Sequence, residues 1–283
     1  MTDQTEAPSQ PPTNGAWKRN PWTCGALSLM CPGFGHVYLG HAERGALLAI
    51  LVYMAIWLAA ALGLLASFTG FALSALAMGT LYVGLAVDAF LLARRQTRFE
   101  PKFYNRIMPY ALFALVLIGL PNYLYTERAK LLGFDRFTVG TEIMNPVLIV
   151  GDSILVDTTA YRGTAPAIGD LVAFQRPGNA FHVDIARIAG VAGDRVELQD
   201  GQVLRNGRVE PDLTVPASYR QETHSRDVPA QTVPEGGVWL LADWRDRARD
   251  SRFNGPYPAV GLIGRVTDIV WSPQRDRIGT SPR

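Results

Sequence analysis

The stretch "TEIMNPVLIVGDSILVD" (residues 141–157) contains an aliphatic run, a Gly-Asp turn and a second aliphatic run. Short apolar runs that end at glycine, proline or aspartate are typical of β-strands. They recur in "GDLVAFQRPG", "HVDIARIAGVAGDRVEL", "GGVWLLAD" and "LIGRVTDIVW". The glycines of "QDGQ" and "RNGR" suit tight hairpins, which need positive φ. We therefore predict a mainly-β domain over residues 131–283.

The residues before this domain are far more apolar. Hydrophobic residues make up 48% of the 283-residue chain, and three nearly uncharged runs cover about residues 45–68, 70–93 and 108–126. Each has roughly the 20 residues that cross a hydrocarbon core about 30 Å thick. Buried helices of a soluble protein are the alternative, but three successive runs of this length rarely fit a globular core. The sequence predicts a multi-pass α-helical membrane anchor within residues 21–130.

The charges of the loops predict the orientation. The loop between the first two runs has no charge, whereas the next loop carries Arg94, Arg95, Arg98, Lys102 and Arg106. Basic loops stay on the cytoplasmic side. Everything after residue 126 should therefore face outward, although two cations of the following segment, Arg128 and Lys130, oppose this orientation.

The N-terminal segments are harder to assign. Residues 1–20 are rich in proline, glutamine and threonine, which predicts a disordered cytoplasmic tail and no cleavable signal peptide. Residues 22–45 are apolar but interrupted by Pro32, Gly33 and Gly35. We expect a short interfacial or re-entrant hairpin there. A fourth membrane span is the alternative and would move the N-terminus outside.

Four stretches of the β domain carry a family resemblance. In order and spacing, "TEIMNPVLIVGDSILVD", "IGDLVAF", "DIARIAGVAGDRVEL" and "ADWRDRARDSRFNGPYPAVGLIGRV" resemble the four signature boxes of bacterial type I signal peptidases. These are membrane-anchored serine proteases that cut leader sequences on the outer face of the membrane. The resemblance covers roughly residues 137–271. It implies a β domain of signal-peptidase type on the outer or periplasmic face of a bacterial inner membrane.

The family resemblance implies a serine nucleophile and a neutral lysine base, but the matching positions are apolar. The nucleophile position is Ile143, the lysine position is Ala186, and the position of the serine that orients the lysine is Ala248. A lysine acts as a base only when desolvation lowers its pKa. No lysine follows Lys130. The sequence therefore predicts that the dyad is lost.

Other positions of the boxes match the family. The resemblance implies that Thr141 is an oxyanion donor and that Ile143, Met144, Pro146 and Ala186 line a peptide-binding groove. The scaffold residues that it implies are Gly151, Asp152, Asp243, Asp250 and Arg252. The framework of the boxes is thus retained although the catalytic positions are not.

Other residues could in principle supply a displaced catalytic set. Thr141 is one candidate nucleophile; Ser153 is another, although it is expected to face solvent after the Gly-Asp turn. His182 would lie roughly 13 Å along a strand from Ala186. His224, with Ser225 and Asp227, resembles a triad in sequence, but triads are assembled across a fold, and a solvated loop is the better interpretation.

These features predict a catalytically inactive homologue in the lipid bilayer. It would bind signal peptides or exported precursor proteins, or act with an active signal peptidase. An active peptidase with a displaced catalytic set and a purely structural membrane protein are the alternatives. Cys24 and Cys31 are expected to be reduced thiols, and no cofactor, metal or nucleic acid is expected.

Overall fold

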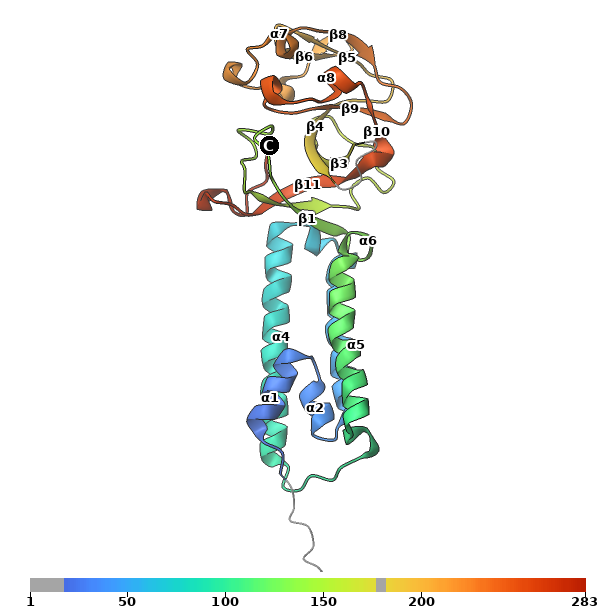
Figure 1. The fold of residues 1–283 in the computed structure, drawn as a ribbon, viewed down its shortest axis with the longest axis vertical. Helices are drawn as coiled ribbons and strands as arrows, with labels where there is room; N and C mark the ends of the chain where they lie inside the picture. Colours follow the sequence, from blue (N-terminus) through green and yellow to red (C-terminus); the bar gives the residue numbers. More distant parts are fainter. Residues whose placement is uncertain (1–17, 177–181) are drawn as a thin grey trace, which may run out of the picture. The chain divides into compact units, whose positions relative to one another are not determined.

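A computed structural model describes residues 18–176 and 182–283 (Figure 1). The described residues form two compact units, which we call the helical unit (residues 18–57 and 75–126) and the β unit (residues 58–74 and 127–283). Most of the expected N-terminal tail, residues 1–17, lies outside the described residues.

Within the described residues, three helices are long and apolar enough to cross a membrane. They are α3 (Ala42–Ala61), α4 (Phe68–Arg95) and α5 (Ile107–Thr126). The prediction of three apolar helices is confirmed, but the first ends seven residues earlier than expected. Gly63 has a φ of 68° and starts a short 3-10 helix, η1 (Leu64–Ala66), instead of continuing α3.

The segment before α3 forms a short helical hairpin. Its helices, α1 (Pro21–Met30) and α2 (Phe34–Tyr38), have 10 and 5 residues, too few to cross about 30 Å at 1.5 Å per residue. A Cβ on Gly35 would lie 2.1 Å from the carbonyl oxygen of Cys24, so only glycine allows this close packing. Cys24 and Cys31 are both buried and free.

A polar cluster joins this hairpin to α3 and α4. The Nε2 atom of His36 lies 2.7 Å from the Asp88 carboxylate, and Arg44 donates to both oxygens of that carboxylate at 2.8 Å. Because an isolated carboxylate is costly in an apolar helix, the two partners explain how Asp88 is tolerated in α4. The sequence patterns did not predict this cluster.

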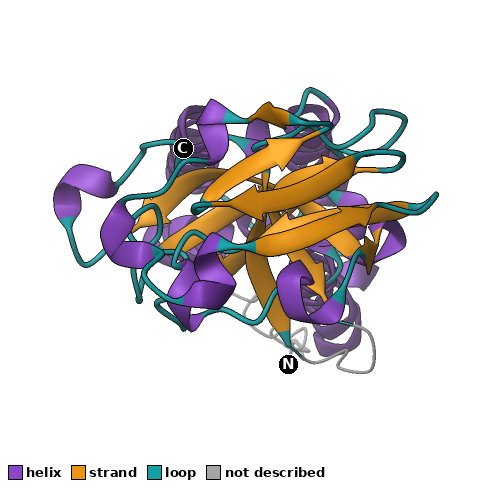
Figure 2. Cartoon of the chain, turned by 90° about the horizontal axis from the view of Figure 1, so that it is seen from above, coloured by secondary structure: helices purple, strands orange, loops and turns teal. Residues whose placement is uncertain are grey.

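The β unit contains two antiparallel sheets (Figure 2). The larger has the strand order β1-β2-β11-β3-β4-β9-β10 and the smaller β7-β6-β5-β8. The strands are β1 (Phe134–Thr138), β2 (Ser153–Asp157), β3 (Leu171–Gln175), β4 (Val183–Val191), β5 (Arg195–Gln199), β6 (Gln202–Arg205), β7 (Arg208–Val209), β8 (Val228–Thr232), β9 (Gly237–Leu241), β10 (Tyr257–Pro258) and β11 (Leu262–Trp271). Short helices lie at the margins, among them α6 (Arg128–Leu131), α7 (Thr223–Arg226) and α8 (Ser251–Asn254).

Two hairpin turns of the smaller sheet match the sequence prediction. Asp200 and Gly201 have φ of 48° and 75° between β5 and β6, and Asn206 and Gly207 have 54° and 77° between β6 and β7. Positive φ at both central residues is the geometry of a type I′ turn. The prediction of a mainly-β domain is confirmed by the eleven strands among its described residues.

The segment between α3 and α4 packs against the β unit. The Thr267 hydroxyl donates to the carbonyl of Ala66 at 2.7 Å, and the backbone N–H of Phe68 donates to Asp268 at 3.0 Å. The rings of Phe71 and Phe134 meet edge to face at 5.9 Å. Residues 58–74 are therefore part of the β unit although they precede it in sequence by more than fifty residues.

Asp194 holds the turn between β4 and β5 and should make stability depend on pH. Burial raises the pKa of its carboxyl, but hydrogen bonds from Val191, Asn206 and Arg205 outweigh burial and hold the pKa below its usual 3.8. A depressed folded-state pKa stabilises the fold above the unfolded-state pKa, and this contribution is lost as pH falls through the folded value.

We expect Asp194→Asn to destabilise the full chain by about 1–3 kcal/mol at pH 7, because charge-assisted hydrogen bonds are lost. The difference from the natural protein should shrink as pH falls below about 4. Urea unfolding followed by tryptophan fluorescence in detergent measures both effects. Asp276→Asn, at an exposed position, is the control. A difference that stays constant with pH would contradict the assignment.

Candidate functional site

The loop that carries Ile143 connects β1 to β2. The aliphatic run after Pro146, expected to be extended, forms turns instead, and β2 begins only at Ser153. The reason lies in Asp152, which is fully buried and accepts hydrogen bonds from the Ile149 backbone, Ser272 and Arg277. This folds the run back so that Leu148 enters the core. Ile143 is half-buried at the start of the loop.

Ile143 and Ala248 belong to one apolar cluster. Both pack in the core that includes Met144, Ile185 and Ala242. The carbonyl of Ile143 accepts a hydrogen bond from the Trp244 backbone at 2.8 Å, which ties the loop to the last signature stretch. The two positions that the family resemblance assigns to serine are thus brought together and are filled by hydrocarbon.

Ala186 packs elsewhere. It is buried in a second cluster with Val172, Phe174 and Leu240, whereas its neighbour Ile185 packs in the Ile143 cluster. Successive residues of a strand point to opposite faces, which explains the separation. The alanine at the lysine position therefore lies in a different cluster from Ile143.

A cavity of about 330 Å³ lies beside Ile143. Residues from two segments line it, 137–144 and 182–185. Of the four residues that the resemblance assigns to the groove, Ile143 and Met144 are among the lining residues, and Pro146 and Ala186 are not. Thr141 and His182 also line it. Asp184 is a further lining residue, which the sequence analysis did not name. The one feature of the sequence that pointed to it was an acidic residue within a mainly apolar strand.

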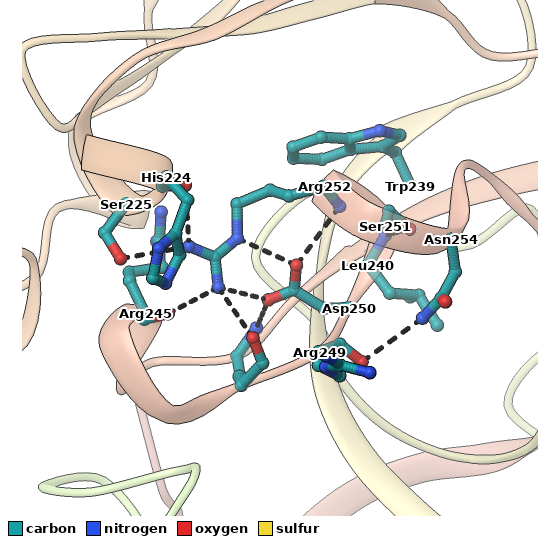
Figure 3. A network of polar contacts seen from close by, with 12 residues as sticks. His224, Ser225, Trp239, Leu240, Arg245, Arg249, Asp250, Ser251, Arg252 and Asn254 are labelled. Atoms are coloured by element: carbon teal, nitrogen blue, oxygen red, sulfur yellow. Dashed lines mark hydrogen bonds and ion pairs between the residues drawn. The ribbon is translucent and has the colours of Figure 1, made fainter. Parts of the chain in front are cut away.

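Two buried ion pairs hold the last signature stretch. Arg187 donates from Nε and Nη2 to the Asp243 carboxylate at 3.0 and 2.9 Å. Arg252 donates from Nε to Asp250 at 2.8 Å and from Nη2 to the carbonyls of Arg245 and Ala248 at 2.6 and 3.3 Å. Figure 3 shows the Arg252 guanidinium between the Asp250 carboxylate and Ser225. The expected scaffold carboxylates thus fix the backbone at Ala248.

Arg245 lies close to the charges of these pairs but is poorly paired. It is fully buried, and only its Nη2 donates, to the Leu213 carbonyl at 2.9 Å. Its Nε and Nη1 find no hydrogen-bond partner among the described residues. Burial lowers the pKa of Arg245 to about 10, against the opposing effect of Asp243 and Asp250. Three arginines and two aspartates therefore leave one buried positive charge in excess.

The alternative catalytic residues are placed differently from expectation. Ser153 is buried, not solvent-facing, and does not line the cavity. Ser225 is fully buried, with its hydroxyl at Arg252, whereas the His224 ring packs on Phe253 at 5.2 Å. The triad suggested by the sequence is not assembled, because its hydroxyl and its imidazole have other partners.

Metal binding finds no support in the described residues. No group of three or more histidine, cysteine, aspartate or glutamate side chains that could hold a metal ion occurs within residues 18–176 and 182–283. The residues that line the cavity offer apolar side chains, two threonines, an imidazole and a carboxylate.

The two arginines of the network should respond in opposite ways to the same replacement. Arg252→Met leaves Asp250 buried without its partner, which typically costs about 3–5 kcal/mol. Arg245→Met removes a guanidinium with two unpaired nitrogens and should leave stability unchanged or raise it. Urea midpoints of the full chain in detergent test this. Equal destabilisation by the two replacements would contradict the account of Arg245.

Comparison with known proteins identifies the family. The family model described as "Signal peptidase, peptidase S26" matches residues 107–271. The chain is 33% identical over 141 residues to the probable thylakoidal processing peptidase 2 of Arabidopsis thaliana, a match covering 47% of this chain and 36% of that protein. It is 28% identical over 175 residues to the probable signal peptidase I-1 of a Synechocystis strain, a match covering 58% of this chain and 81% of that protein.

A third relative and a solved structure come from other bacteria. The probable signal peptidase I of Mycobacterium leprae is 24% identical over 237 residues, with 62% of this chain and 80% of that protein covered. A crystal structure of a signal peptidase I from Enterococcus faecalis matches 37% of this chain and 98% of its own, with 27% identity and a TM-score of 0.31. Because the family model covers more than half of the chain, this protein belongs to the signal peptidase family, peptidase S26.

Proposed function

We propose that this protein is a catalytically inactive signal peptidase homologue that binds signal peptides in extended form. The observation that carries the proposal is the cavity beside Ile143, whose walls include two strand edges with free backbone groups. An edge of this kind can accept an added peptide strand, with main-chain hydrogen bonds for affinity and side-chain pockets for specificity.

The two edges belong to β1 and β4. β1 is the terminal strand of the larger sheet and pairs only with β2. In β4, Val183 to Ala186 pair with β3, and pairing with β9 begins only at Arg187, so these residues pair with no other described strand. Residues of both edges line the cavity. An extended peptide between them would pair with backbone groups that have no strand partner among the described residues.

The proposed loss of catalysis rests on three apolar side chains at polar positions of the family. Ile143 and Ala248 share a hydrophobic cluster, and Ala186 lies in another. Removing a nucleophile or base from a serine protease costs a factor of roughly 10⁶ in turnover. Apolar replacement of all partners avoids leaving a buried amine or hydroxyl unsatisfied, at about 1–3 kcal/mol.

We further propose a multi-pass protein of the bacterial inner membrane with the β unit on the outer face. The uncharged segment 58–74 packs in the β unit, and the basic loop 94–106 lies at the other end of α4. By the positive-inside rule the basic loop is cytoplasmic. Exported precursor proteins, and an active signal peptidase that cleaves them, are the partners this location offers.

One observation favours an active enzyme as the second candidate. Thr141 and His182 line the same cavity, so a hydroxyl and an imidazole could both approach a bound peptide. A purely structural role predicts a closed surface at Ile143, and the 330 Å³ cavity counts against it.

Cleavage of a leader-peptide precursor by the full chain in detergent separates these candidates. We expect the natural protein and the variant Ile143→Ser with Ala186→Met to be inert, because both lack an amine base. Ile143→Ser with Ala186→Lys restores both family residues and should cut, provided that the lysine side chain, which starts in a different cluster from Ile143, extends around β4 to the serine. Cleavage by the natural protein, abolished by Thr141→Ala or by His182→Ala, would instead identify the displaced catalytic set.

Peptide binding is tested without reference to cleavage. Ile143→Trp fills the cavity and should weaken binding of a fluorescent leader peptide at least about tenfold, or roughly 1.4 kcal/mol. Val209→Trp places the same ring at an exposed position of β7 and should bind normally. Fluorescence anisotropy gives both affinities. Equal affinities would refute binding in this cavity.

A further inference from the structure

Asp184 is a buried carboxylate at the cavity, and its Oδ2 atom has no hydrogen-bond partner among the described residues. Its side chain is 7% exposed, and Asp184 is one of the residues that line the cavity. The Nε of Arg176 approaches Oδ2 at 2.5 Å, yet neither atom makes a hydrogen bond, and His182 lies 3.5 Å from Oδ1. Among the described residues, the carboxylate therefore has an ion pair with Arg176, but Oδ2 accepts no well-aligned hydrogen bond.

A carboxylate in this position has acceptor capacity to spare. An ionised carboxylate offers about four lone-pair sites, and leaving such a group buried and unsatisfied costs free energy. The Arg176 side chain offsets the negative charge of Asp184. Because this side chain is 37% exposed, water screens the attraction between the two charges. A ligand in the cavity can thus supply the hydrogen-bond donor that Oδ2 of Asp184 lacks.

Strand addition would bring such a donor. A peptide beside β4 places alternate side chains on opposite faces of the sheet. One set would lie beside Ile185, whose face holds the Ile143 cluster, and the other beside Asp184. Directly opposed residues on neighbouring strands have Cβ atoms about 4.5–5.5 Å apart, within reach of a charged side chain.

We propose that Asp184 gives the cavity a preference for peptides with a basic side chain at the position that faces it. The lysine or arginine of the peptide would donate to the Asp184 carboxylate. The peptide residues on either side of it would point to the other face of the sheet and contact the apolar cluster at Ile143. This inference rests on the proposed peptide binding and adds to it the charge of the ligand.

The test uses fluorescent leader peptides in which each position in turn is lysine or norleucine, its apolar counterpart of similar length. With the full chain in detergent at physiological salt, lysine should bind at least about tenfold more tightly than norleucine at one or more positions of a single parity. Asp184→Asn keeps the shape of the side chain and should abolish that preference. Asp200→Asn, in an exposed ion pair with Arg226, should retain it.

Arg176→Gln provides a second, independent variant. It removes the competing cation and should increase the preference for lysine. Binding without a lysine preference at any position, or a preference that survives in Asp184→Asn, would overturn the role of Asp184 while leaving peptide binding intact. If no peptide of the series binds, the proposed function itself fails, and the inference fails with it.

Discussion

The ion pair between Asp250 and Arg252 is the contact on which the candidate site depends. The carboxylate accepts from the Ala242 backbone next to β9, and the guanidinium reaches the carbonyls of His224, Arg245 and Ala248. Four stretches of backbone thereby converge on two side chains. Because both side chains are almost fully buried, every one of these bonds forms at low dielectric, where an unmatched partner is costly.

This dependence explains how the fold accommodates apolar side chains at the three positions that the family resemblance assigns to serine, lysine and serine. The ion pairs fix the backbone through carboxylates and guanidinium groups, none of which is the nucleophile or base of the family mechanism. Ile143, Ala186 and Ala248 contribute only packing, and each is held by apolar neighbours. The polar framework thus uses side chains other than those at the three positions, so these positions can change while the framework keeps the backbone in place.

The sequence predicted the elements with strong local signals and missed those set by distant contacts. The Asp-Gly and Asn-Gly turns and the three apolar helices are local and were predicted. The early end of α3 at Gly63, the turns after Pro146 and the burial of Ser153 depend on tertiary packing and were not. At the site, Ile143 and Met144 could be named from the sequence and line the cavity, but the separate cluster of Ala186 and the buried carboxylate of Asp184 depend on the arrangement of β4.

The packing of residues 58–74 makes the β unit discontinuous in sequence. A chain cut to begin at Glu127 would lack the partners that residues 58–74 supply to Thr267, Asp268 and Phe134, which would leave an aromatic face uncovered. Residues 58–74 are synthesised before residues 127–283. The β unit therefore completes its fold only when these two segments pack together. The connection between α3 and α4 is in this sense a structural part of the β unit and not only a link between two helices.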